Sequence, residues 1–195
     1  MSGSQPVMDP WTEVRTRHGF QADELISALQ KEIRRGQVEN AGALAYEMAT
    51  TSPELEHMLW QRLKVISVED VGLGNPMAPI LVDTLERFSQ GFERGSGDRR
   101  LFVIHAVRYL STSMKDRSSD EMSQWLAWAI ESGNLLPTVP DYALDMHTQR
   151  GSQMGRSRRH FFEEAAKIEP ELPNRDTTYH QRLLEGLDER GAQEE

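Results

Sequence analysis

Three residues in one short segment have side chains that could bind a divalent metal ion. Asp141, Asp145 and His147 lie within seven positions, and on a helix the two carboxylates would share a face. The chain has no HExxH motif, no G-x-S-x-G motif and no cysteine that would complete a metal or hydrolase site. We therefore expect capping or surface roles here, with no catalytic or metal site, and keep an enzyme of unknown chemistry as an alternative.

The highest density of positive charge follows directly, in residues 147–162, which include four arginines and no acidic residue. The arginines are Arg150, Arg156, Arg158 and Arg159. Together with His147, their side chains could donate paired hydrogen bonds to phosphate groups of DNA or to another anion. Acidic residues in the segment 163–195 could instead neutralise them. Anion binding and structural ion pairing therefore both stay open.

Composition excludes several classes of protein. The net charge of −9 argues against a surface that wraps DNA without specificity. No apolar run approaches the length of a membrane span, and the first residues lack a signal pattern. The chain has no cysteine and no G-x-x-x-x-G-K-[ST] motif, so disulfides and ATP hydrolysis by a P-loop are excluded. We expect a soluble, cytoplasmic protein without a cofactor or a membrane partner.

The elements that carry these residues are helices. Apolar residues recur at spacings of three and four, and no stretch alternates with period two for long enough to form a strand. Helices are expected to begin at or just after Asp23, Val38, Ser52-Pro53, Asn75-Pro76, Asp98 and Ser118. The fold class is therefore all-α, an irregular helical bundle of about six to nine helices.

Periodicity and composition also predict how the chain is divided. We expect a mobile N-terminal tail in residues 1–20, a helical core in 21–133, a loop and basic segment with short helices in 134–170, and an acidic helix or tail in 171–195.

The helix expected from Ser118 contains two tryptophans, Trp125 and Trp128, three positions apart. Apolar neighbours extend around much of its circumference, which is typical of a central helix or of one at a subunit interface. Burial within one chain and an oligomer interface explain this pattern equally well.

The sequence EDVGLGNP at 69–76 joins two expected helices. Its carboxylates, Glu69 and Asp70, could contact a metal or a partner. The structural interpretation is that Asp70 accepts hydrogen bonds from backbone N–H groups, Gly72 and Gly74 supply a positive φ, and Asn75 caps a helix that Pro76 begins. We expect the structural role.

Four segments, in this order, are similar to landmarks of one protein family. They are residues 25–31 (LISALQK), 67–76 (SVEDVGLGNP), 106–111 (AVRYLS) with Lys115 and Ser118, and 136–140 (LPTVP). Together they resemble the helical region that follows the ATPase core in the RarA/MgsA family of replication-associated recombination ATPases. The resemblance covers roughly residues 21–160; residues 147–162 follow the family only loosely, and the ATPase module is absent.

That resemblance implies a fold like a clamp-loader collar, a homo-oligomer, tetrameric as in the family, and contacts with replication proteins. The function expected is a non-enzymatic oligomerisation and protein-interaction module in DNA replication, recombination or repair, with a separate AAA+ ATPase or a replisome protein as candidate partner. The alternative is a nucleic-acid-binding protein that uses the arginines of residues 147–162.

Overall fold

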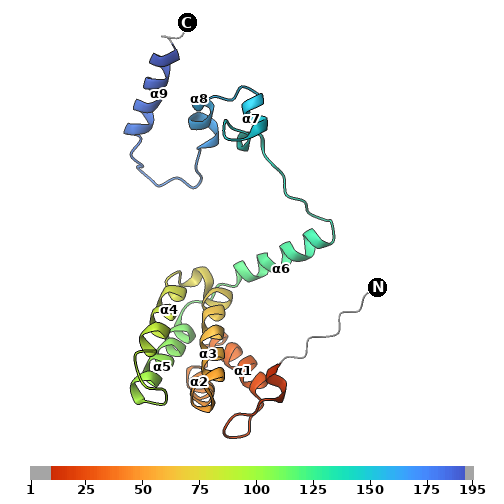
Figure 1. Ribbon diagram of the computed structural model, residues 1–195, viewed down its shortest axis with the longest axis vertical. Helices are drawn as coiled ribbons and strands as arrows, with labels where there is room; N and C mark the ends of the chain where they lie inside the picture. The colour runs from red at the N-terminus through yellow and green to blue at the C-terminus, as the bar shows by residue number, and fades with distance from the viewer. Residues whose placement is uncertain (1–9, 192–195) are drawn as a thin grey trace. The chain divides into compact units, whose positions relative to one another are not determined.

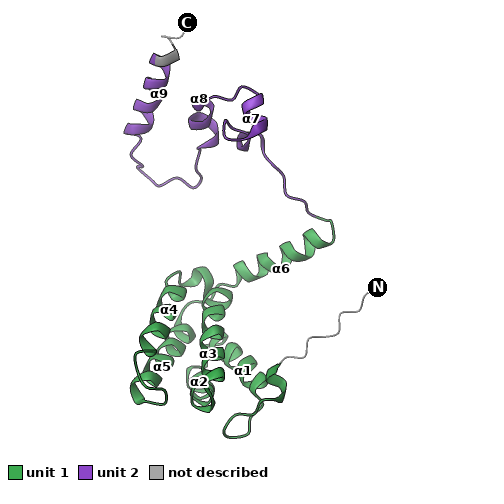
Figure 2. Cartoon of the chain, viewed as in Figure 1, with its two compact units in different colours: residues 1–134 green, residues 135–195 purple. Residues whose placement is uncertain are grey.

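A computed structural model describes residues 10–191 and divides the chain into two compact units (Figure 2). Unit 1 is Met1–Asn134 and unit 2 is Leu135–Glu195. The described residues form helices and turns without a strand, and a single isolated β-bridge joins Arg15 to Gln21. The all-α fold class is therefore confirmed.

The bundle of unit 1 consists of five helices, and a sixth follows them (Figure 1). Their bounds are α1 (Ala22–Arg34), α2 (Val38–Thr51), α3 (Pro53–Ile66), α4 (Ala78–Ser89), α5 (Gly97–Thr112) and α6 (Ser118–Glu131). Helix α2 packs against α1, α3 and α5, and α4 packs against α5. The main contact of α6 is with a short π-helical turn, η2 (Ser67–Val71), which continues α3.

Local sequence signals explain where some helices begin. The Ser52 side chain accepts a hydrogen bond from the Leu55 N–H at 3.1 Å, and Pro53 occupies the first helical position of α3, as expected. Helix α5 begins one residue before Asp98, because Ser96 caps it by accepting from the Arg99 N–H. Helix α1 begins before Asp23, and no side chain caps it.

Helix α4 differs most from its expected bounds. Asn75 was expected to cap it, but the Asn75 amide donates instead to the Tyr109 hydroxyl at 2.7 Å and the Ser113 hydroxyl at 3.1 Å. The helix begins at Ala78 and ends at Ser89, well short of Gly95. Gly91 lies two residues beyond this end, where glycine favours the unwinding of a helix.

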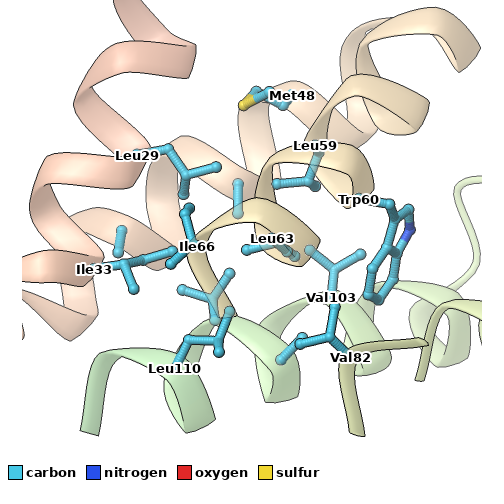
Figure 3. Close-up of a cluster of buried hydrophobic side chains, with 14 of the residues drawn as sticks. Leu29, Ile33, Met48, Leu59, Trp60, Leu63, Ile66, Val82, Val103 and Leu110 are labelled. Atoms are coloured by element: carbon cyan, nitrogen blue, oxygen red, sulfur yellow. The ribbon is translucent and has the colours of Figure 1, made fainter. Parts of the chain in front are cut away.

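The core of unit 1 is formed by leucine, isoleucine, valine and alanine side chains from α1 to α5 (Figure 3). The largest fully buried side chains are Leu29, Ile33, Met48, Leu55, Leu59, Leu63, Ile66, Leu110, Val71, Val82, Val103 and Val107. Each buried leucine or isoleucine stabilises the fold by about 1.5–3 kcal/mol before conformational entropy is counted. In α1 and α3 these side chains lie along the apolar faces that the sequence predicts. In α4 the expected apolar series is wrong in part, because Met77 and Phe88 are 58% and 57% exposed and Val82 is buried instead.

Residues 10–20, expected to belong to a mobile tail, have defined structure. Pro10–Glu13 form a 3₁₀ turn, η1, and Trp11 and Val14 pack against the core. Thr16 is buried. Its backbone N–H donates to the Phe20 carbonyl oxygen, and its carbonyl oxygen accepts from the Gly19 N–H, in the loop that precedes α1. The expected tail is therefore wrong for residues 10–20, and its first nine residues lie outside the described part of the chain.

Unit 2 contains only short helices before its last one. Its elements are η4 (Asp141–Ala143), α7 (Gln149–Gln153), α8 (Arg158–His160), η5 (Phe161–Ala165) and α9 (Thr178–Gly191). No apolar side chain is fully buried among its described residues. Its side chains instead make ion pairs, such as Arg156 with Asp141, and aromatic contacts, such as Phe161 with Phe162. The segments expected at 134–170 and 171–195 belong to one compact unit. No helix described in either unit is long and apolar enough to cross a membrane.

Candidate functional site

The carboxylate of Asp70 is the centre of a buried ionic cluster at the end of α3. Asp70 is completely buried, and it accepts a hydrogen bond from the Gln30 amide at 3.0 Å. It also accepts from the Arg34 Nε and from the Arg117 Nη1, the latter at 2.7 Å. Because α1, η2 and the residue before α6 each supply a group, this cluster ties three parts of unit 1 together.

Arg117 connects the same cluster to the first turn of α6. Its guanidinium donates to Glu69 at 3.1 Å as well as to Asp70, and its other Nη donates to Asp120 inside α6. Arg34 donates to Glu69 at 3.0 Å from the opposite side. The start of α6 is therefore fixed by charge-assisted hydrogen bonds.

The loop between α5 and α6 packs closely against the glycines of the short 3₁₀ turn η3 (Gly72–Gly74). Gly72 has a φ of +50°, and a Cβ built there would overlap the carbonyl oxygen of Asp116. A Cβ on Gly74 would lie 2.7 Å from the carbonyl oxygen of Met114. The positive φ predicted for the two glycines is thus confirmed at Gly72 and wrong at Gly74. The close approach of the two backbones is a second reason for glycine at Gly72 and the reason for it at Gly74.

Lys115, in the loop between α5 and α6, binds the C-terminal end of α5. Its ammonium donates to the carbonyl oxygens of Leu110 and Ser113 at 2.8 and 2.6 Å, which satisfies the C-terminal end of α5. Burial lowers the pKa of Lys115, and the nearby charge of Asp70 partly opposes that shift. The lysine therefore belongs with the cluster around Asp70. We call the cluster of Gln30, Arg34, Glu69, Asp70, Lys115 and Arg117 the junction.

The roles predicted for Asp70, Asn75 and Pro76 change. Asp70 binds side chains of Gln30, Arg34 and Arg117 rather than backbone N–H groups, and Asn75 bonds α5 side chains rather than capping α4. Pro76 is exposed and precedes α4 without being part of it. The cationic partners of Asp70 could not be found by spacing, since Arg34 and Arg117 lie 36 and 47 positions away.

Helix α6 exposes most of its apolar side chains. Its exposed large apolar residues, which extend around much of the helix, are Met122, Trp125, Trp128 and Ile130, with exposed fractions of 60%, 52%, 61% and 47%. Leu126 is partly buried. Ala129 alone is buried in this helix. Trp125 and Trp128 thus contribute little to the core of unit 1, and the apolar face of α6 is available for another surface. We call these four side chains the α6 face.

A mainly apolar groove of about 490 Å³ lies beside the first half of α6. Val65 and Val68, 42% and 51% exposed, line it from α3 and η2. Ser119 and Ser123 line it from α6. The groove could accept an apolar side chain from a molecule that packs on the α6 face.

Two of the four arginines expected to bind anions are occupied by acidic residues of unit 2. Arg156 places one Nη 2.7 and 2.6 Å from the two carboxylate oxygens of Asp141, and its side chain is only 13% exposed. Arg159 pairs with Glu163 at 2.8 Å and also with Asp188.

The other two arginines have different surroundings. Arg158 lies over the Phe162 ring, 5.8 Å from its centroid. Arg150 is exposed and makes no ion pair with any described residue. The four side chains therefore do not converge on a single site, and structural pairing accounts for Arg156 and Arg159.

Asp141 pairs with Arg156, whereas Asp145 and His147 bond each other, so the three side chains do not form one site. Hydrogen bonds from Arg156 lower the pKa of Asp141. Asp145 accepts from the His147 backbone N–H at 2.9 Å and lies 3.1 Å from its ring Nδ1, and these bonds lower the pKa of Asp145. No group of three or more His, Asp or Glu side chains in the described part of the chain could hold a metal ion.

Neither a model of a known protein family nor a curated protein matches this chain. The features of this chain that bear on its function are therefore the α6 face, the cluster around Asp70 that fixes the start of α6, and the arginines of unit 2.

Proposed function

We propose that this chain is a non-enzymatic oligomerisation and protein-interaction module whose self-association surface is the α6 face. The observation that carries the proposal is the exposure of Trp125 and Trp128, 52% and 61%, on a helix that is anchored at its first turn. Large aromatic side chains are enriched at the centres of interfaces and are seldom left in water in a contiguous patch.

The area of the two indoles indicates how much they contribute. A tryptophan buries up to about 250 Å², so exposed fractions of 52% and 61% correspond to about 280 Å² on one copy. At about 25 cal/mol per Å² this area is worth up to about 7 kcal/mol per copy. A symmetric contact buries the area of both copies, which is comparable to the association cost of about 4–15 kcal/mol. The two tryptophans therefore determine whether the copies associate.

The resemblance to the RarA/MgsA family extends the proposal to DNA replication, recombination or repair, with a separate AAA+ ATPase as partner and a tetramer as the assembly. What supports this extension is the position of three resembling segments. Gln30 of residues 25–31, Asp70 of residues 67–76 and Lys115 all belong to one junction. Segments far apart in sequence therefore share one structural purpose, as landmarks of one domain would.

The mass in solution tests the self-association. Sedimentation equilibrium of the full chain at 1–100 µM, a range chosen to cover micromolar dissociation constants, is expected to give an oligomer. The double variant Trp125→Ser/Trp128→Ser is expected to be a folded monomer. Leu101→Ser is the matched control, since Leu101 is 66% exposed on α5 and away from the α6 face. A monomeric wild type, or an oligomer that survives the double substitution, contradicts the proposal.

The ATPase partner is tested separately. A purified RarA/MgsA-family ATPase that lacks its own helical region is mixed with the chain, and the mass of the mixture is measured. A joint complex is expected. Two species that sediment independently would remove the ATPase from the proposal and leave self-association intact.

A further inference from the structure

A small cavity beside the N-terminal half of α3 is not used by the junction or by the α6 face. It has a volume of about 110 Å³ and lies between α3, the end of α4 and the start of α5. Its lining includes Glu56, Trp60, Glu86, Arg94 and Arg99. This space is large enough for one small polyatomic ion.

The Trp60 indole N–H is a buried donor in this lining. Trp60 is 3% exposed, and its Nε1 has no hydrogen-bond partner in the described residues. Figure 3 shows the indole nitrogen on the side of the ring turned away from Leu63 and Ile66. Buried donors are rarely left unpaired, so an acceptor absent from the chain itself is expected beside this nitrogen.

Two guanidiniums share a single carboxylate in the same lining. The Glu56 side chain, 5% exposed, accepts from the Arg94 Nε at 3.1 Å and from the Arg99 Nε at 2.7 Å. Arg94 Nη2 donates to the Ala49 carbonyl oxygen and Arg99 Nη1 to that of Phe92. Each guanidinium therefore keeps one Nη that donates to no described residue, and the three groups together carry one excess positive charge.

The remaining charges do not cancel this excess inside the cavity. Glu86 is paired with Lys64. Glu54 is exposed and outside the lining; hydrogen bonds with its own backbone and with Ser52, and then the charge of Arg94, lower its pKa. Two partly exposed guanidiniums that share one buried carboxylate, beside a buried neutral N–H donor, are suited to an oxyanion.

We propose that this cavity is a binding site for one small oxyanion of the phosphate type, with Trp60 Nε1 and the unused Nη groups of Arg94 and Arg99 as donors. The anion is either free in solution or a phosphate group carried by a peptide. A water molecule would satisfy the indole alone, whereas an oxyanion could also accept hydrogen bonds from the two unused Nη groups.

The experiment follows the four tryptophan indole signals of the ¹⁵N-labelled full chain during a titration with inorganic phosphate. Ionic strength and pH are held constant with chloride as the balancing anion. The Trp60 signal is identified by its loss in Trp60→Phe, which keeps an aromatic ring in the core and removes the donor. That signal is expected to shift saturably, while the signals of Trp125 and Trp128 do not follow the same curve.

Variants separate a specific site from general ionic effects. Arg94→Gln is expected to weaken phosphate binding at least tenfold, and Arg87→Gln, an exposed arginine on α4, is expected to leave it unchanged. If Arg94→Gln does not fold, Trp60→Phe still decides the question, because phosphate should raise the melting temperature of the wild type and not of that variant. A second titration with a phosphoserine peptide and its unphosphorylated form distinguishes a carried phosphate from a free one.

A Trp60 signal that does not move with phosphate at constant ionic strength would overturn the proposal and leave water as the acceptor. The same conclusion follows if the shift is equal in the wild type and in Arg94→Gln.

Discussion

The replacement of Asp70 by asparagine is the sharpest test of the junction that fixes α6. Asp70→Asn keeps the size of the side chain but removes its charge, which leaves Arg34 and Arg117 with Glu69 as their remaining shared carboxylate. Removing one partner of a buried ion pair costs about 3–5 kcal/mol. Arg34 and Arg117 are 29% and 30% exposed, so water can solvate part of their charge. We therefore expect a loss near the lower limit, about 3 kcal/mol.

Urea unfolding followed by tryptophan fluorescence measures this loss. All four tryptophans, Trp11, Trp60, Trp125 and Trp128, lie in unit 1, so the fluorescence reports on that unit alone. With a slope of about 2 kcal/mol per M of urea, the midpoint should fall by about 1.5 M.

The control is Asp83→Asn, which breaks an exposed ion pair between positions i and i+4 of α4. Asp83 is 54% exposed and its partner Arg87 is 62% exposed, so the expected loss is at most about 0.5 kcal/mol. If Asp70→Asn lowers the free energy of unfolding by no more than this control, the cluster around Asp70 does not hold the junction together and the reasoning is refuted.

Two further predictions concern other parts of unit 1. Gly72→Ala should destabilise the unit by more than about 1 kcal/mol, and by more than Gly95→Ala, because both glycines have a positive φ but only Gly72 faces a backbone oxygen; equal urea midpoints would contradict this. Burial raises the pKa of Glu47, but hydrogen bonds from Thr16 and His18 outweigh it and bring the pKa from 4.5 to about 2. Since a lowered pKa in the folded state means that the ionised form is favoured, the contribution of Glu47 is complete above pH 4.5 and is lost as the pH falls towards 2. Glu47→Gln should therefore lower the melting temperature more at pH 7 than at pH 2.5, and an equal decrease at both values would exclude this contribution.

Features that depend on neighbouring residues could be predicted from the sequence. The cap of α3 by Ser52, with Pro53 at the first helical position, needs only a serine and a proline in the right order. The positive φ of Gly72 could also be predicted from a glycine between two helices, but the same prediction fails at Gly74, where glycine accommodates the Met114 carbonyl oxygen instead. The all-α class follows from many such local signals together with the periodicity of the apolar residues.

Features that depend on distant residues could not be predicted. Asn75 has the residue type and the position of a helix cap. The packing of α5 brings the hydroxyls of Tyr109 and Ser113 close, however, and they accept hydrogen bonds from the Asn75 amide instead. The exposure of Trp125 and Trp128 in α6 could not be predicted from the sequence either. Periodicity identifies a helix with apolar residues on several sides, whereas exposure depends on whether another helix of the chain reaches it.

The π-helical turn at Ser67–Val71 has a consequence for how this segment can change in length. Its widening is visible in the hydrogen bond from the Gly72 N–H to the Ser67 carbonyl oxygen, which spans five residues instead of four. A deletion of one residue there would restore α-helical spacing but rotate all that follows by about 100°. The carboxylate facing the two arginines would then be displaced, together with the start of α6. Substitutions at exposed Val68 should be tolerated, whereas single-residue deletions in this turn should not.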